Sequence, residues 1–188
     1  MLLKAFLVFI IPTAALLVGV AVFSCLPEHK AVQRRVSGPG PLHWAVTPLN
    51  QRLKGYSVAE AKAYWALLAE DVASERHMLK VDLAFPVAYG VAFATALLLA
   101  WSTLAWSVNP VWLLAPVAVL VAADWTENIV QLGQLARLNA KGEGELSATW
   151  IGVASLATQL KLAMLLVCTI LTIGSAGCLV EHHFRRAF

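Results

Sequence analysis

Charged and amide side chains interrupt the apolar part of the chain in a regular pattern. Asp124, Glu127 or Asn128, and Gln131 recur at helical spacing, so one helix would carry them on a single face. A later apolar stretch contains one cation, Lys161. Ionisable groups at membrane depth are costly, and they usually pair or take part in function. The pattern therefore predicts a buried polar pocket in which Lys161 neutralises Asp124.

Further pocket residues are predicted by reflecting positions across the short turns between the apolar stretches. Tyr89 comes out at the depth of Asn128. Asp82 comes out at the depth of Gln134 or Leu135, at the mouth of the pocket. The complete predicted pocket consists of Asp82, Tyr89, Asp124, Glu127, Asn128, Gln131, Thr158 and Lys161.

Two interpretations of this pocket stay open. In the structural one, the ion pair and interhelical hydrogen bonds hold helices together where hydrophobicity cannot. In the functional one, the same groups bind a lipid or isoprenoid head group, relay ions, or catalyse a reaction. The acidic oxygens also suit hard cations. However, no His pair at helical spacing, Gly-rich phosphate loop or Cys-x-x-Cys motif accompanies them. We therefore predict no catalytic residue, metal or cofactor. A bound phospholipid is the ligand to consider.

Composition indicates an integral, multi-pass membrane protein. The 188 residues are 60% hydrophobic and 13% charged, with a mean hydropathy of +0.72, which is far from the usage of soluble domains. A membrane-spanning helix needs about 20 apolar residues. We predict an all-α fold, an antiparallel bundle with both termini on one side. Its four transmembrane helices cover residues 2–26 (retained, not a cleaved signal), 81–107, 111–135 and 147–180.

The segments between and beyond these helices are predicted from shorter patterns. Residues 27–56, rich in Pro and Gly, are expected to form an irregular arm. Residues 57–80 are expected to form an amphipathic helix, which begins at a capping box of Ser57 and Glu60. It would lie in the membrane interface or cover the mouth of the bundle. Residues 81–180 form a three-helix unit, and residues 181–188 a basic-aromatic tail.

Basic residues suggest an orientation and a lipid contact. Most Lys and Arg residues flank the two larger loops, which places those loops in the cytosol or matrix and both termini outside. The formal net charge of +3 fits this bias and contact with anionic phospholipids; no nucleic-acid-binding patch is present. The expected head-group contacts are Arg76, Lys80, Arg185 and Arg186. The three cysteines, Cys25, Cys168 and Cys178, are expected to be reduced core thiols.

Several spaced motifs occur together between Tyr56 and Leu166. They are Tyr56 to Ala61, Arg76, Asp-x-x-Phe-Pro-x-x-Tyr-Gly from Asp82, Asp-x-x-Glu-Asn from Asp124, and Thr158 with Lys161. The set resembles a widespread family of small four-helix membrane proteins with no assigned activity. This resemblance implies that the polar residues act as a unit, and it implies no chemistry. The Pro/Gly arm, Trp125 and the tail from Glu181 lie outside the pattern.

The remaining features favour a partner protein. Tryptophans stand near the predicted membrane boundaries, and a row of Gly152, Ser155 and Gln159 would let another helix approach closely. We therefore predict a structural or accessory, lipid-contacting subunit of a larger membrane complex rather than an enzyme. Its host would be a respiratory-type membrane, the bacterial or mitochondrial inner membrane. The alternative is a lipid-binding protein, or a small intramembrane enzyme or transporter, that uses Asp124, Glu127, Asn128 and Lys161.

Overall fold

The computed structural model describes residues 2–36, 48–68, 71–141 and 146–187. Within these ranges every regular element is a helix. Residues 37–47 of the predicted Pro/Gly arm lie outside the described residues. The helices are α1 (Leu2–Cys25), α2 (Pro27–Val36), η1 (Leu49–Gln51), α3 (Val58–Leu68), α4 (Val72–Asp82), α5 (Phe85–Leu104), α6 (Pro110–Lys141) and α7 (Ala148–Ala187).

Four helical stretches are long and apolar enough to cross a membrane, as the sequence predicted. They cover Leu2–Val22, Val72–Leu104, Pro110–Leu138 and Ala148–Arg185. The last one differs from its predicted end near Val180, because α7 continues through the predicted tail to Ala187. No Gly or Pro stops the helix there, and an ion pair between Arg185 and Glu181, one turn apart, supports its last turns.

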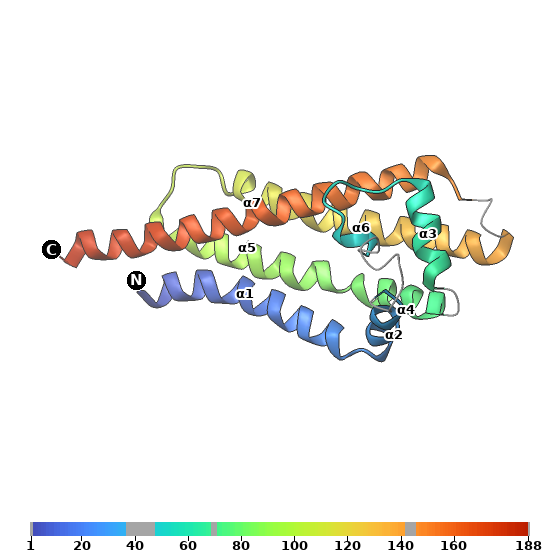
Figure 1. Ribbon diagram of the computed structural model, residues 1–188. Coiled ribbons are helices and arrows are strands. Elements are labelled where there is room, and N and C mark those ends of the chain that lie inside the picture. Colours follow the sequence, from blue (N-terminus) through green and yellow to red (C-terminus); the bar gives the residue numbers. More distant parts are fainter. Residues whose placement is uncertain (1, 37–47, 69–70, 142–145, 188) are drawn as a thin grey trace.

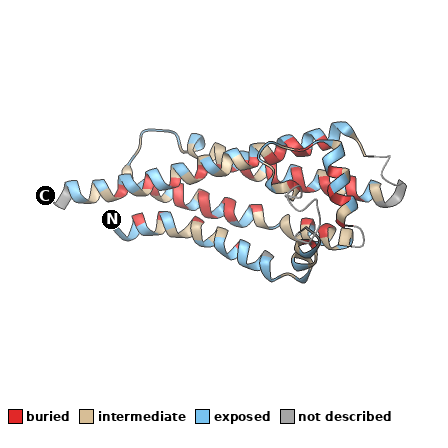
Figure 2. Cartoon of the chain, viewed as in Figure 1, coloured by how far each residue is buried: buried red, intermediate tan, exposed pale blue. Residues whose placement is uncertain are grey.

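The four long stretches lie side by side. In Figure 1 both chain ends lie at one end of the molecule, whereas α2, α3 and α4 gather at the other. Helix α7 packs against α1, α5 and α6, and α1 also packs against α5. Buried residues follow the faces that the helices turn toward one another, and exposed residues cover the outside (Figure 2).

Helix α2 corrects the predicted boundary of the irregular arm. Residues 27–36 are helical. Pro27 stands at the first position, where its missing N–H costs nothing, and Glu28 lies in the first turn, where a negative charge is favourable. The prolines and glycines that disfavour a helix follow only after Val36. Val32 is buried in the same cluster as Leu79 of α4.

The predicted amphipathic helix over residues 57–80 is two helices, α3 and α4. Helix α4 then reaches α5 through a tight turn, in which Leu83 N donates to Lys80 O and Ala84 N donates to Val81 O. Because Pro86 has no N–H, it is tolerated only in the first turn of a helix, and it stands there in α5. The second long stretch is therefore interrupted beside Asp82.

Helix α3 covers the end of the long helices. Its Ala61, Trp65 and Leu68 are buried in one cluster with Leu135 of α6 and Ile151 of α7. Trp65 is completely buried there, as the prediction that this helix covers the mouth of the bundle requires. The predicted apolar face of the helix is confirmed.

The capping box at the start of α3 is also confirmed. Glu60 N donates to Ser57 Oγ at 3.2 Å, and Ser57 N donates to Glu60 Oε2 at 2.7 Å. The hydrogen bonds that the backbone N–H and the hydroxyl of Ser57 donate to the Glu60 carboxylate lower the pKa of that group. Arg52 Nη1 lies 3.3 Å from Glu60 Oε1 and ties the preceding loop to the same carboxylate.

Gly55 brings this loop onto α7. Its φ of +72° lies in the left-handed region, and a Cβ there would overlap the side chains of Ser155 and Gln159, so only glycine fits. The next residue, Tyr56, donates its N–H to Ser155 Oγ at 2.7 Å. The small-residue row that we assigned to a partner helix is therefore covered, at Ser155 and Gln159, by the chain's own loop.

Replacing Ser57 should destabilise α3. Ser57→Ala removes the side-chain cap and should cost about 1 kcal/mol of local stability, whereas Ser57→Thr keeps a capping hydroxyl. The expected result is faster hydrogen exchange of the α3 backbone amides in Ser57→Ala than in Ser57→Thr or the unmodified protein. Equal exchange in all three proteins would mean that packing alone holds α3.

Candidate functional site

An ammonium group between two carboxylates joins α6 to α7. Lys161 Nζ lies 3.2 Å from Asp124 Oδ1 and 2.5 Å from Glu127 Oε2. Lys161 is 9% exposed, Asp124 4% and Glu127 0%. The predicted pairing of Lys161 with Asp124 is confirmed. The structure adds that Lys161 bridges two acids, which the helical spacing of Asp124 and Glu127 allows because residues three apart share a face.

Asp124 connects this ion cluster to the α4–α5 segment. Tyr89 OH donates to Asp124 Oδ2 at 2.7 Å. Asn128 Nδ2 donates to Asp124 Oδ1 at 3.3 Å and to Asp82 Oδ2 at 3.1 Å. The predicted depth of Asp82, level with Gln134 or Leu135, is therefore wrong. The predicted depth of Asp82 holds only for one unbroken helix. The turn after Asp82 shifts the level of this residue along α6.

Glu127 connects the cluster to the opposite side. Gln131 Nε2 donates to Glu127 Oε1 at 3.1 Å and to Tyr56 OH at 2.9 Å. Thr158 is fully buried beside Glu127 and Tyr56, and its hydroxyl donates to Ala154 O at 3.0 Å. All eight predicted pocket residues thus lie in or beside one hydrogen-bonded network.

Sequence reasoning missed three polar anchors of this region. Tyr56 closes the network, and burial followed by the nearby Glu127 charge raises its pKa to about 12. Trp125 Nε1 donates to Leu83 O at 2.9 Å, which fastens the α4–α5 turn to α6. Tyr64 OH donates to Glu75 Oε1 at 3.4 Å, and burial is the main cause of the raised pKa of Tyr64. Glu75 could have been found from its seven-residue spacing to Asp82.

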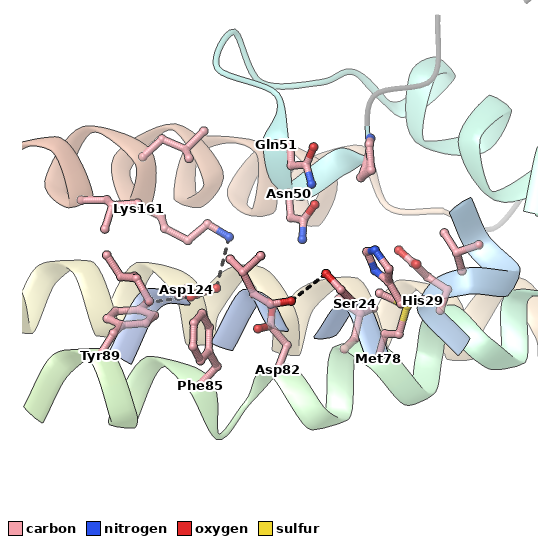
Figure 3. Close-up of a pocket in the computed structure, with 18 of the residues that line it drawn as sticks. Ser24, His29, Asn50, Gln51, Met78, Asp82, Phe85, Tyr89, Asp124 and Lys161 are labelled. Atoms are coloured by element: carbon pink, nitrogen blue, oxygen red, sulfur yellow. Dashed lines mark hydrogen bonds and ion pairs between the residues drawn. The ribbon is translucent and has the colours of Figure 1, made fainter. Parts of the chain in front are cut away.

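A cavity of about 480 Å³ adjoins the network. Asp82, Tyr89, Asp124 and Lys161 line it, and Figure 3 shows Lys161, Asp124 and Tyr89 in one part and Ser24, His29 and Met78 in another. Glu127, Asn128, Gln131 and Thr158 are not among its lining residues and lie behind the wall. The apolar wall comes from six helices and includes Leu16, Val20, Val32, Leu79, Phe85, Leu120, Leu162 and Leu165.

The predicted head-group residues do not gather at this cavity. Arg76 and Lys80 lie on α4, at the opposite end of the molecule from Arg185 on α7 (Figure 1). Arg185 is paired with Glu181, and the side chain of Arg186 lies outside the described part. None of the three whose side chains are described, Arg76, Lys80 and Arg185, lines the cavity. Any contact they make with anionic lipid heads would be on the outer surface, and it remains a prediction.

The cysteines are free, as predicted, but only Cys168 is buried, whereas Cys25 and Cys178 are exposed. The prediction of core thiols is therefore wrong for two of the three. Helices α1 and α7 carry these two thiols on their outward faces, where an apolar pattern alone cannot tell a lipid-facing position from a core position. Among the residues that the structure describes, no group of three or more His, Cys, Asp or Glu is placed to hold a metal ion.

No family model, curated protein or solved structure matches this chain. The resemblance to small four-helix membrane proteins therefore remains a prediction. What the site can do has to be derived from its own geometry.

Removing Lys161 should leave Glu127 less well stabilised than Asp124. Lys161→Met leaves uncompensated buried charge and should cost about 3–5 kcal/mol. Asp124 would keep two side-chain donors, from Tyr89 and Asn128, whereas Glu127 would keep one, from Gln131. Adding Glu127→Gln should therefore restore more stability than adding Asp124→Asn, as measured by thermal unfolding in a mild detergent. Equal rescue, or no loss in Lys161→Met, would contradict this description of the cluster.

The raised pKa of Tyr56 predicts a loss of stability at high pH. Because its pKa is about 12 in the folded protein against 10.0 ordinarily, the unfolded state loses its proton first as pH rises. Tyr56 should make its full contribution to the free energy of unfolding below pH 10. Between pH 10 and pH 12 that contribution should fall by about 2 kcal/mol. Tyr56→Phe should show a smaller decline over this window in the same unfolding measurement. An identical decline would mean that Tyr56 is not the group responsible.

Proposed function

We propose that this chain is a multi-pass membrane protein, that its four long stretches form an antiparallel transmembrane bundle, and that its cavity binds an apolar or amphipathic molecule drawn from the membrane. The observation that carries the proposal is the cavity itself, which has apolar walls and a polar network on one side. No reaction is assigned to it.

The outer surface supports placement in a membrane. Exposed large apolar side chains occur on all four long stretches, including Leu3, Val91, Trp112 and Leu156. The charged cluster, in contrast, is buried. In water, continuous apolar patches of this kind promote association, whereas in a bilayer they contact lipid tails and the interior holds the polar groups.

The cavity has the properties of a ligand site. Its volume lies within the range of about 300–1,000 Å³ that is typical of small-molecule pockets, and such pockets combine apolar walls with a few placed polar groups. Val20 lines it although its side chain is 62% exposed. The cavity therefore reaches the outer face of α1, which gives a molecule in the membrane a route inward.

A role as an accessory subunit is the second candidate, and the length of α7 favours it. A helix of 40 residues is about 60 Å long, roughly twice the hydrocarbon thickness of a bilayer. In Figure 1 the C-terminal end of α7 extends beyond the N-terminus of α1. This projecting end carries Glu181 and Arg185, and it offers a neighbouring subunit in a bacterial or mitochondrial inner membrane a polar surface.

Filling the cavity from α1 should remove the bound molecule. Val20→Trp places a large side chain in the cavity wall, and Val18→Trp is its matched control, because both valines are 62% exposed and only Val20 lines the cavity. We expect Val20→Trp to co-purify with at least about tenfold less of the small amphiphile than Val18→Trp. The measurement is mass spectrometry of extracted lipids per mole of protein. Equal amounts in both variants would contradict binding in the cavity.

A further inference from the structure

We propose that the molecule bound in this cavity is an amphiphile with an ammonium head group. This inference rests on the proposed function and names the ligand class of the same site. It follows from the charges that line the cavity, from hydrogen-bonding atoms left without partners, and from the order of acidic and apolar side chains along the α4 wall.

The cavity wall is rich in acidic groups. Glu75, Asp82 and Asp124 all line it, and Glu75 and Asp124 are 7% and 4% exposed. Glu75 and Asp82 are seven residues apart on α4, so they share one face of that helix, with Met78 and Leu79 also on the lining. The two carboxylates therefore flank an apolar section of the same wall.

The cation beside these acids already has carboxylate partners. Lys161 is the one Lys or Arg among the described residues that line the cavity. Its ammonium lies between Asp124 and Glu127, so two carboxylates share its charge. Glu75 and Asp82 have no Lys or Arg in an ion pair within the described part. Buried negative charge without a cation is expensive, and a ligand cation would offset it.

Two further polar atoms at the cavity lack hydrogen bonds. Asn50 Oδ1 and His29 Nδ1 are buried without a partner in the described structure, and both residues line the cavity. Figure 3 shows Asn50 on the side of the cavity opposite Asp82. A buried polar group that is left without a hydrogen bond is destabilising. An ammonium supplies three N–H donors and no acceptor, which suits the Asn50 carbonyl oxygen and, in the tautomer protonated at Nε2, the Nδ1 atom of His29.

An anionic head group fits these walls poorly. A phosphate or carboxylate near Asp82 and Asp124 would meet like charges in a low-dielectric site. Of the donors beside Asp124 on this wall, the Tyr89 hydroxyl already donates to Asp124, and the Lys161 ammonium lies between Asp124 and Glu127. The cavity therefore selects against the anionic phospholipids expected at the outer surface.

The test compares head groups on one tail. The purified full-length protein in a neutral detergent is mixed with equal amounts of dodecylamine, dodecanol and sodium dodecanoate, and native mass spectrometry measures the fraction carrying each. We expect the amine to bind at least about tenfold more tightly than dodecanoate, which corresponds to about 1.4 kcal/mol. Binding of dodecanol or dodecanoate as tight as that of the amine would overturn the head-group assignment and leave the cavity proposal standing. Binding of none of the three, with Val20→Trp equal to Val18→Trp, would overturn both.

A charge variant tests the assignment to the α4 wall. Asp82→Asn removes one lining carboxylate and keeps an oxygen that can accept from Asn128. It should weaken dodecylamine binding by about tenfold and leave dodecanol binding unchanged. The control is Glu181→Gln, which removes an exposed carboxylate outside the cavity and should change neither. Equal losses in both variants, or loss of dodecanol binding in Asp82→Asn, would contradict recognition of the head by this wall. The wild-type comparison stands even if Asp82→Asn fails to fold.

Discussion

Lys161 holds α7 against α6 through its contacts with Asp124 and Glu127. Charges buried among apolar helices are tolerated only when they meet a partner, and Lys161 meets both acids at one register of α7 against α6. Tyr89 donates a hydrogen bond to Asp124 and Asn128 donates one to Asp82, so the α4–α5 segment is held to the same cluster. Four helical elements are therefore held in register by hydrogen bonds and charge, where apolar packing alone would let them slide past one another.

The cavity follows from this arrangement. The network occupies the faces of α4, α5, α6 and α7 that meet one another, and none of the α1 side chains that the structure describes belongs to it. Helix α1 instead contributes Leu16 and Val20 to an apolar wall. The first loop covers the end of the bundle, because Gly55 and Tyr56 bind α7 and Trp65 is buried in a cluster with residues of α6 and α7. An enclosed space with acids on one side and an opening beside α1 is the result.

Local sequence patterns predicted the parts that depend on periodicity. The four apolar stretches, the polar stripe on α6, the pairing of Lys161 with Asp124 and the capping box of Ser57 and Glu60 each follow from spacing and from the cost of burying charge. The missed features depend on distant contacts. Asp82 was misplaced because the turn fastened by Trp125 was not foreseen, and Tyr56 joins the network only because Gly55 brings its loop onto α7. Glu75 was overlooked because its partner Tyr64 lies on another helix.

A crystal structure of the protein grown from a lipid mesophase would show whether the cavity holds an amphiphile. We predict continuous density in the cavity, with a tail against Leu16 and Leu165 and a head within hydrogen-bonding distance of the Asp82 or Asp124 carboxylate. The cluster of Lys161, Asp124 and Glu127 should be present as described. A cavity closed by α1, or filled with water alone, would contradict the proposed binding function and would leave the network a purely structural role.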